Sequence, residues 1–553
     1  MPTIERRIGL LFLVFCALLA IAAFRAIQLG GLKGSSLRHK ADTQQVSQVV
    51  VPARRGTITD HRGVELAASE PADDIAVTPY LIKDPAAAAS RLAPLLHQPV
   101  DKVLRKVAQR GTGFVYLTRT LPATQAQRIA ALKMPGIQLI PSSRRIYPQR
   151  WMASQLLGAV GTDGGGLSGL EYARNRYLQG SDGERRLVKD ALGQPISMRD
   201  MRLSRPGLDL RLTLDAAIQD KVETVLQQVG QKFSPRGATA LVMDPQTGAI
   251  MAMANWPRVD ADNVAGAPAF ARQNRAVGAT YEPGSTFKAF TVAGALEDKK
   301  VTPATVFGVP PQLQVSDRTI HDAEDHGYES LTTAQILAQS SNIGAVEIAM
   351  RDGRKRFDHW VRTFGFAKPT GIDLSGEESG IVPQLKQYSG SSIGNLPIGQ
   401  GLAVTPIQMA TAYAAIANGG ILRPPHVIKQ VGARRLPLPK GHRIIQPQTA
   451  ASLRAMLEGV LGPGGTASEA SIPGYKLAGK TGTAQKPDPV NGGYSQDKFV
   501  ASFVGFAPAK NPRLLVAVMV DEPQGEIYGG LVAAPAFQAI TRFALPYLGI
   551  PPG

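Results

Sequence analysis

The chain has 553 residues, a formal net charge of +18 and a single cysteine, Cys16. Its length suits two or more domains, and one cysteine excludes an intramolecular disulfide, so the fold must depend on a packed core. The positive charge is compatible with a membrane surface or an anionic polymer. The sequence has no zinc-finger, RNA-binding or basic-helix signature, which argues against a nucleic-acid partner.

An apolar segment at residues 8–24 follows Arg6 and Arg7. It is long enough to cross the ~30 Å hydrocarbon core of a bilayer as one helix. A cleavable signal peptide is the alternative, because residues 20–22 match an A-x-A cleavage pattern. We expect an uncleaved cytoplasmic tail and anchor at residues 1–29 of a single-pass inner (plasma) membrane protein, with the bulk of the chain extracytoplasmic.

Three regions follow the anchor. Residues 30–48 are polar and marked by Gly and Ser, as expected of a juxtamembrane linker. Residues 49–204 predict a strand- and turn-rich domain without a catalytic motif, with a helical piece at 122–134. The pattern changes near Pro206, so we expect a second domain at residues 205–553.

The second domain combines helices and strands in an order that predicts an α+β fold. Apolar residues recur at helical spacing in 218–229, directly after Asp215, and residues 287–462 are helix-rich. Strands are expected at 239–244, 249–254, 475–484, 499–507 and 514–521, and a closing helix at 533–547. This order favours an antiparallel sheet covered by helices.

Three short motifs follow one another in this domain. They supply a serine, a lysine beside it, a second hydroxyl, an amide and a second lysine, which suffice for acyl transfer without a histidine or a carboxylate base. Each motif occurs by chance when alone, but their order and spacing together favour a catalytic site. The motifs are Ser285-x-x-Lys288, Ser340-x-Asn342 and Lys480-Thr481-Gly482-Thr483.

The first motif predicts a nucleophile and its base. A serine hydroxyl becomes a good nucleophile only when a neighbouring group takes its proton. Ser285 and Lys288 are three residues apart on a helix that we expect to begin after Pro283, so their side chains are neighbours. Lys288 acts as a base only when neutral, and burial near the cation Lys480 would lower its pKa.

The other motifs predict the remaining groups of the site. Ser340 is positioned to relay a proton to a leaving amine, and Asn342 to orient a substrate amide. We expect residues 476–485 to form an edge strand on which Gly479 and Gly482 let a substrate backbone approach closely.

Lys480 and the hydroxyls of Thr481 and Thr483 would hold a substrate carboxylate or polarise the site. The backbone N–H groups of Ser285 and Thr483 are the candidate oxyanion hole.

Two other patterns lead to weaker interpretations. Residues 474–481 match the G-x-x-x-x-G-K-T pattern of phosphate-binding loops, which needs a helix directly after it, whereas Pro487 and Pro489 follow here. The cluster at residues 321–326 resembles a metal site, but its two histidines are five residues apart. We expect a solvated acidic loop there and no metal.

The three motifs resemble the active-site motifs of class B penicillin-binding proteins, the monofunctional D,D-transpeptidases of bacterial walls. Residues 55–60 and 169–171 resemble the family's non-catalytic pedestal, or dimerisation-like, module, although His61-Arg62-Gly63 replaces a more usual Arg-Asn-Gly. The division-type subgroup is the most similar, through residues 364–366, 369–374, 502–508 and 528–530. The resemblance implies a penicillin-binding/β-lactamase-like transpeptidase domain behind a strand-rich pedestal and one transmembrane helix.

The same resemblance implies the reaction. Ser285 would attack the penultimate carbonyl of a D-Ala-D-Ala stem peptide, and an amine of a neighbouring stem would take the acyl group and cross-link septal wall. β-Lactams would acylate the same serine, and no metal or organic cofactor would be needed. Expected partners are a SEDS-type glycan polymerase and other divisome proteins. An elongation-type transpeptidase and a non-enzymatic divisome scaffold are the alternatives.

Overall fold

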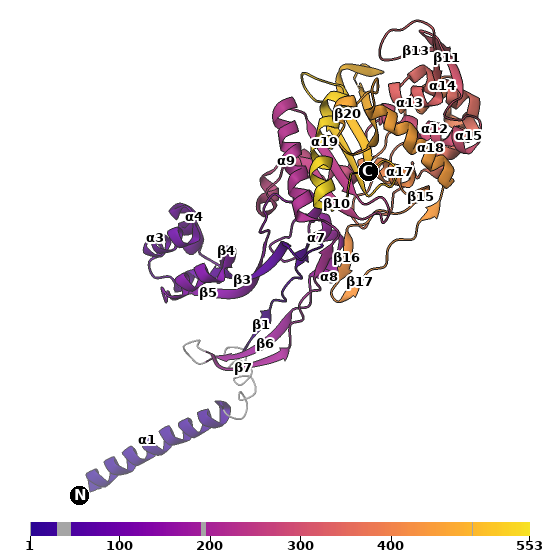
Figure 1. Ribbon diagram of the computed structural model, residues 1–553. Coiled ribbons are helices and arrows are strands. Elements are labelled where there is room, and N and C mark those ends of the chain that lie inside the picture. The colour runs from indigo at the N-terminus through magenta and orange to yellow at the C-terminus, as the bar shows by residue number, and fades with distance from the viewer. Residues whose placement is uncertain (1, 30–45, 190–194, 489, 553) are drawn as a thin grey trace. The chain divides into compact units, whose positions relative to one another are not determined.

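The computed structural model describes residues 2–29, 46–189, 195–488 and 490–552 (Figure 1). The chain forms two compact units, each made of three segments. Unit 1 consists of Met1–Arg54, Glu70–Arg144 and Gly180–Gly207, and unit 2 consists of Arg55–Ser69, Arg145–Gln179 and Leu208–Gly553.

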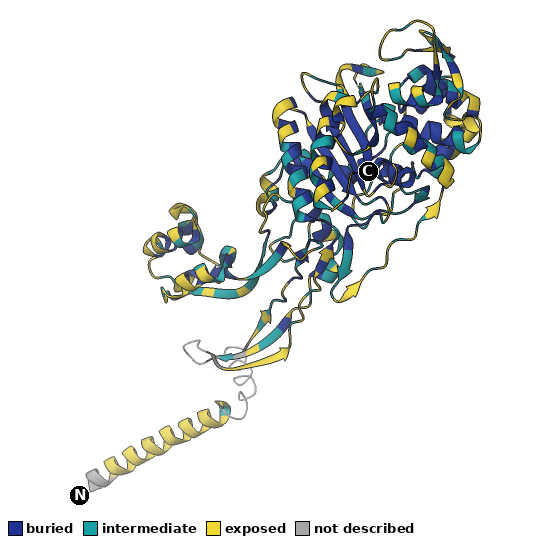
Figure 2. Ribbon diagram, in the orientation of Figure 1, coloured by how far each residue is buried: buried dark blue, intermediate teal, exposed yellow. Residues whose placement is uncertain are grey.

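Unit 1 begins with α1 (Pro2–Ile27), whose described side chains are almost all exposed, as the yellow helix in Figure 2 shows. The part from Arg6 to Ile27 reaches a mean hydropathy of 2.6, and no other helix in the described ranges is long and apolar enough to cross a membrane. A helix pairs its own backbone groups, so an apolar one is stable in hydrocarbon.

The rest of unit 1 contains a three-stranded sheet and a small α/β layer. The sheet consists of β1 (Val46–Val51), β6 (Gly183–Lys189) and β7 (Pro195–Arg202), in that order. The layer consists of β3 (Glu65–Val77, in unit 1 from Glu70), η2 (Pro79–Leu81), α3 (Pro85–Leu96), α4 (Val100–Val107), β4 (Val115–Pro122), α5 (Ala123–Ala130) and β5 (Ile137–Ile146).

The predicted linker and one predicted helix fall in unit 1. The predicted linker at 30–48 lies outside the described residues up to residue 45, and Val46 already pairs with Val188 in the sheet. The predicted helix at 122–134 is α5, which ends at Ala130, and the chain turns at Lys133, where φ is 46°.

The centre of unit 2 is an antiparallel sheet of five strands. In spatial order these are β10 (Ile250–Trp256), β9 (Gly237–Met243), β21 (Leu514–Asp521), β20 (Tyr494–Ala507) and β19 (Ala478–Pro487). Successive side chains of a strand point to opposite faces, and here both faces are apolar. The sheet is therefore largely buried, dark blue in Figure 2, and β19 lies at one edge.

Helices cover both faces of this sheet (Figure 1). The helices concerned are α9 (Ala216–Phe233) and α19 (Gly529–Tyr547) on one face, and α17 (Pro406–Ala417) and α18 (Pro447–Glu458), backed by α12 (Lys288–Glu297), on the other. Val242 belongs to the apolar cluster of the first face and its neighbour Leu241 to that of the second. The period of two along β9 thus places one core on each side of the sheet.

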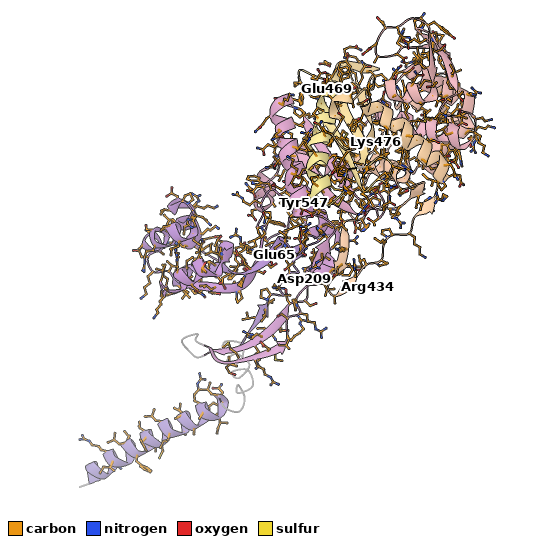
Figure 3. All side chains as sticks on the ribbon, in the orientation of Figure 1. Glu65, Asp209, Arg434, Glu469, Lys476 and Tyr547 are labelled. Carbon is orange, nitrogen blue, oxygen red and sulfur yellow. The ribbon has the colours of Figure 1, made fainter. Side chains whose placement is uncertain are left out.

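The C-terminal end of α19 is hydrogen-bonded to the N-terminal end of α9. Asp215 caps α9, because its carboxylate accepts hydrogen bonds from the N–H groups of Ala217 and Ile218 at 3.0 and 3.2 Å. Tyr547, labelled in Figure 3, donates its hydroxyl to the same carboxylate, 2.9 Å from Oδ1. The two helices on this face are therefore joined at their ends.

The other described elements of unit 2 are short and lie outside the central sheet. They are β2 (Ile58–Thr59), α6 (Ser154–Leu157), α7 (Gly169–Ala173), α8 (Asn175–Leu178), β8 (Leu210–Leu212), η3 (Ala261–Gly266), α10 (Ala269–Arg272), α11 (Arg275–Gly278), η4 (Gly284–Phe287), β11 (Val306–Val309), β12 (Leu313–Val315), β13 (Arg318–Ile320), β14 (Glu329–Thr332), α13 (Thr333–Gln339), α14 (Asn342–Asp352), α15 (Arg354–Thr363), η5 (Leu385–Gln387), α16 (Ser392–Asn395), η6 (Leu396–Ile398), β15 (Ile421–Leu422), β16 (Ile428–Val431), β17 (Arg434–Arg435), β18 (His442–Arg443), η7 (Gly459–Leu461) and η8 (Ser468–Ala470).

The predicted α+β class is confirmed, and the five predicted strands form the central sheet. Two elements start at least four residues earlier than predicted. Strand β20 extends back to Tyr494, which pairs with Pro487, and α19 begins at Gly529 rather than at residue 533. Both extensions are set by partners across the fold, which local periodicity does not contain.

Candidate active site

The first motif lies where a loop becomes a helix. Residues Gly284–Phe287 form the 3-10 turn η4, and α12 begins at Lys288. Gly284 has φ +55°, and a Cβ there would lie 3.0 Å from Ala484 Cβ on β19, so glycine lets the turn approach that strand. Ser285 is half-buried and lies one turn before Lys288, as predicted.

Lys288 joins the first motif to the second. Its side chain is fully buried, and Nζ donates hydrogen bonds to Ser340 O at 2.5 Å and to Asn342 Oδ1 at 2.6 Å. Ser340 Oγ lies 3.3 Å from the same nitrogen. The amine therefore points at both predicted polar groups of the second motif.

The second motif occupies a turn between two helices. Ser340 caps the C-terminus of α13 in a left-handed conformation, with φ 66°, which is strained for a residue with a Cβ. Ser341 caps the N-terminus of α14, and Asn342 is the first residue of that helix. The Asn342 amide is held at both ends, because its Nδ2 donates to His321 O at 2.8 Å.

Asp322 belongs to this arrangement, although the motifs did not include it. Its Oδ1 accepts hydrogen bonds from the N–H groups of Asn342 and, at 3.0 Å, Ile343. Its Oδ2 accepts one from Ser341 Oγ at 2.7 Å and lies 3.1 Å from His326 Nε2. Most of the loop at 321–326 is exposed as predicted, but the prediction of a solvated loop is wrong for Asp322.

The third motif lies on the edge strand β19, so the predicted edge strand is confirmed. Lys480 is fully buried, with Nζ 3.3 Å from Thr481 Oγ1. The Thr481 hydroxyl shares a 2.6 Å hydrogen bond with that of Thr466. Thr483 Oγ1 accepts one from the N–H of Gly529, at the start of α19.

Gly479 and Gly482 of β19 lie close to other parts of the protein. A Cβ on Gly479 would lie 2.7 Å from the Phe503 ring. A Cβ on Gly482 would lie 2.5 Å from Ser502 Oγ and 2.9 Å from Pro283 O. Both glycines therefore permit close packing inside the protein, and Gly482 lets β19 approach the turn that carries Ser285.

Burial sets the charge of both lysines. Removal from water lowers the pKa of Lys288 to about 7, against the opposing effect of the Asp322 carboxylate, which raises it. Burial, and then the charge of Lys288, hold the pKa of Lys480 well below its ordinary value. The prediction that burial depresses the pKa of Lys288 agrees with this, and the charges of the two lysines act on each other, as the lowered pKa of Lys480 indicates.

The two weaker interpretations find no structural support. Strand β19 runs through Lys480 and Thr481 to Pro487, so no helix opens where a phosphate-binding loop needs one. Within the described ranges, no group of three His, Cys, Asp or Glu side chains is placed to hold a metal ion.

A cavity of about 540 Å³ is lined by residues that include Gln485 on β19 and Glu282, three residues before Ser285. The Glu282 carboxylate accepts hydrogen bonds from the Gly401 N–H at 3.1 Å and the Tyr494 hydroxyl at 3.3 Å, and burial raises its pKa. The residues that line this cavity flank the motifs, and none of them is a motif residue. Sequence reasoning missed Glu282, because its partners are distant in the chain.

Comparison with known proteins supports this geometry. Residues 238–542 match the Penicillin binding protein transpeptidase domain and residues 50–212 the Penicillin-binding Protein dimerisation domain. The chain is 33% identical to the peptidoglycan D,D-transpeptidase FtsI of Escherichia coli, over 97% of this chain and 91% of the relative. It is 32% identical to the probable peptidoglycan D,D-transpeptidase PenA of Neisseria gonorrhoeae, over 100% and 94%.

Solved structures show the same likeness. The crystal structure of penicillin binding protein 3 from Mycobacterium tuberculosis, complexed with aztreonam, is similar with a TM-score of 0.72 and 31% identity. The match covers 91% of this chain and 98% of that one. Matches of this extent, across both domains and the three motifs, show that the chain belongs to the class B penicillin-binding proteins of the FtsI type.

Proposed function

We propose that the protein is a peptidoglycan D,D-transpeptidase that cross-links stem peptides through an acyl-enzyme on Ser285. The observation that carries this proposal is the buried Lys288 amine, one turn after Ser285 and hydrogen-bonded to Ser340 and Asn342. A lysine with a pKa of about 7 is partly neutral near neutral pH, so it is available as a base.

In the acylation half-reaction, Ser285 Oγ forms a bond to the penultimate D-Ala carbonyl carbon, and its proton passes to Lys288 Nζ. The C–N bond to the terminal D-Ala breaks. The proton then passes from Lys288 through the Ser340 hydroxyl, 3.3 Å away, to the departing amine. Lys288 returns to its neutral form for the second half-reaction.

In the second half-reaction, an amine of a neighbouring stem attacks the ester carbon and gives a proton to Lys288. The C–Oγ bond breaks and Ser285 regains the proton. A β-lactam follows only the first half, because its leaving amine remains attached to the acyl group.

The remaining predicted residues bind the substrate in this proposal. Asn342 orients its amide, and Lys480, Thr481 and Thr483 hold its carboxylate. Gly482 lets the substrate backbone approach the strand closely, and the N–H groups of Ser285 and Thr483 form the oxyanion hole.

The cellular setting is also a proposal. The exposed apolar helix α1 supports an anchor at residues 1–29, with a linker at 30–48, a pedestal at 49–204 and an extracytoplasmic transpeptidase domain at 205–553. The FtsI-type likeness supports a role in septal synthesis, with a SEDS-type polymerase and other divisome proteins as partners.

Labelling with fluorescent penicillin tests the chemistry. The full chain in detergent should form a stable adduct that mass spectrometry maps to Ser285, and Ser285→Ala should form none. Ser90→Ala, an exposed serine on α3, is the matched control and should label like the wild type. Adduct formation by Ser285→Ala, or none by folded wild type, contradicts the proposal. D-Ala release from a stem pentapeptide with an acceptor amine then separates a transpeptidase from a scaffold.

Localisation of a fluorescent fusion tests the setting. We expect a midcell band in dividing cells, lost when residues 1–29 are deleted. A lateral-wall pattern indicates the elongation-type alternative instead, and co-purification of the polymerase tests the partner.

A further inference from the structure

The loop before β14 contacts the second motif through both backbone and side-chain atoms. The Asp322 carboxylate accepts hydrogen bonds from the first two N–H groups of α14 and from the hydroxyl of the N-cap residue, Ser341. The carbonyl oxygen of the preceding residue, His321, accepts a hydrogen bond from the Asn342 side-chain amide. The position of Asn342 is therefore determined by this loop as well as by its own helix.

From these contacts we propose that Asp322 is a positioning residue of the acyl-transfer site, which fixes Asn342 against Lys288 and provides the negative charge that this amine faces. The inference rests on the proposed function, since it assigns to Asp322 a part in the reaction of Ser285. In this role Asp322 acts through Asn342 and Lys288 rather than on the nucleophile or the substrate.

The first part of the role is geometric. Three of the four groups that meet Asp322 belong to the turn and first residues of α14, so its carboxylate closes the N-terminus of that helix. Asn342 Oδ1 accepts the Lys288 hydrogen bond at 2.6 Å. A displacement of the start of α14 would therefore move both the Asn342 amide and the Lys288 amine that it holds.

The second part of the role is electrostatic. Two charged groups bear on the Lys288 amine: Asp322 from the loop and Lys480 from β19. His326 lies against Asp322, and Glu329 adds its charge to that of Asp322 at His326. The carboxylate favours the ammonium form of Lys288, so neutralising Asp322 should let Lys288 lose its proton at lower pH.

The test compares three variants of the full chain in detergent. Asp322→Asn keeps the shape and can still accept from the two N–H groups, but removes the charge. Asp322→Ala removes both contact and charge. Asp325→Asn is the matched control, since it makes the same change on an exposed residue of the same loop. For each, the second-order rate constant of acylation by fluorescent penicillin is measured from pH 5 to 9, with thermal unfolding as the check on folding.

We expect Asp322→Asn to move the midpoint of the acid limb down by about one pH unit, so that its rate relative to wild type is higher at pH 6 than at pH 8. Asp322→Ala should lose about 10²-fold at every pH through misplacement of Asn342, and Asp325→Asn should change neither quantity.

An unchanged midpoint in Asp322→Asn overturns the electrostatic role, and wild-type rates in a folded Asp322→Ala overturn the geometric one. Mapping the wild-type adduct in the same samples distinguishes these failures from that of the proposed function. If the wild type carries no adduct at Ser285, the proposed function is wrong and the inference fails with it.

Discussion

Lys288 is the residue whose protonation controls the proposed reaction. Burial lowers its pKa to about 7, and only the neutral amine accepts the Ser285 proton. The neutral fraction rises as pH increases through this value. We therefore expect the rate constant of penicillin acylation to rise about tenfold per pH unit below 7 and to level off above it. Stopped-flow acylation kinetics across this range measure the profile, and a rate independent of pH between 5 and 8 contradicts it.

A substitution at Lys288 separates the effect of its positive charge from its role as a base. Lys288→Arg keeps the hydrogen-bond donors but cannot become neutral in this pH range, so acylation should fall by about 10³-fold. Lys299→Arg, at the exposed end of α12, is the control and should leave the rate unchanged. Retained acylation by Lys288→Arg, with Ser285 still labelled, would mean that another group accepts the proton.

Residue patterns predict the members of this site better than they predict its supports. The Ser285, Ser340 and Lys480 motifs are recognisable because each requires fixed local spacing. Asp322 and Glu282 act through partners far away in the chain, so no local spacing marks them. The packing of Gly482 against Pro283 and Ser502 likewise depends on a contact between two elements, which the local pattern does not contain.

The contact between β19 and the turn η4 brings the third motif close to the first. A Gly482→Ala methyl group would meet Pro283 O at 2.9 Å, and a backbone atom there cannot move aside freely. We expect a loss of about 1–3 kcal/mol in the free energy of unfolding and slower acylation, because the strand must shift away from Ser285. Denaturant unfolding and penicillin labelling measure the two effects.

Gly327→Ala is the matched control for this variant, since a Cβ there meets nothing within 4 Å. Its stability and acylation rate should equal those of the wild type. Wild-type values for Gly482→Ala as well would show that β19 and η4 have room that the packing does not indicate.

Elements with strong periodicity or an apolar run were predictable, and those defined by a partner were not. The two-faced apolar strands β9 and β21 occur within two residues of their predicted bounds, and the capped helix α9 begins within two residues of its predicted start. The polar start of β20 is a strand only because β19 lies beside it. Short hairpins such as β12 and β13 likewise take their structure from each other.

At the scale of the whole molecule, segments of the two units alternate along the chain. A division of the sequence into consecutive domains does not predict this alternation. Segments Arg55–Ser69 and Arg145–Gln179 lie within the predicted pedestal but pack as part of unit 2. Glu171 joins these two segments to each other, since its fully buried carboxylate pairs with Arg55 at 2.6 Å and with Arg145 at 2.7 Å. Such a buried triad is stable only when all its members are present.

This interleaving predicts that residues 205–553 are not an independent folding unit. Without the two earlier segments, the core of unit 2 loses apolar side chains that are at most 1% exposed, namely Leu156, Leu157, Leu170 and Leu178. The buried Glu223 carboxylate also loses the Ala153 N–H, 2.7 Å from its Oε1. Each buried leucine contributes about 1.5–3 kcal/mol, and the total approaches the 5–15 kcal/mol that stabilises a whole domain.

We therefore expect residues 46–553 to unfold cooperatively and to react with penicillin, and residues 205–553 to be unfolded or aggregated and unreactive. Leu170→Ala in residues 46–553 should lie between them, destabilised by about 2–5 kcal/mol but still labelled at Ser285. Calorimetry and labelling of the three proteins give the order. Equal melting temperatures for the two fragments would contradict it, and would place the physical boundary of the transpeptidase domain at residue 205 after all.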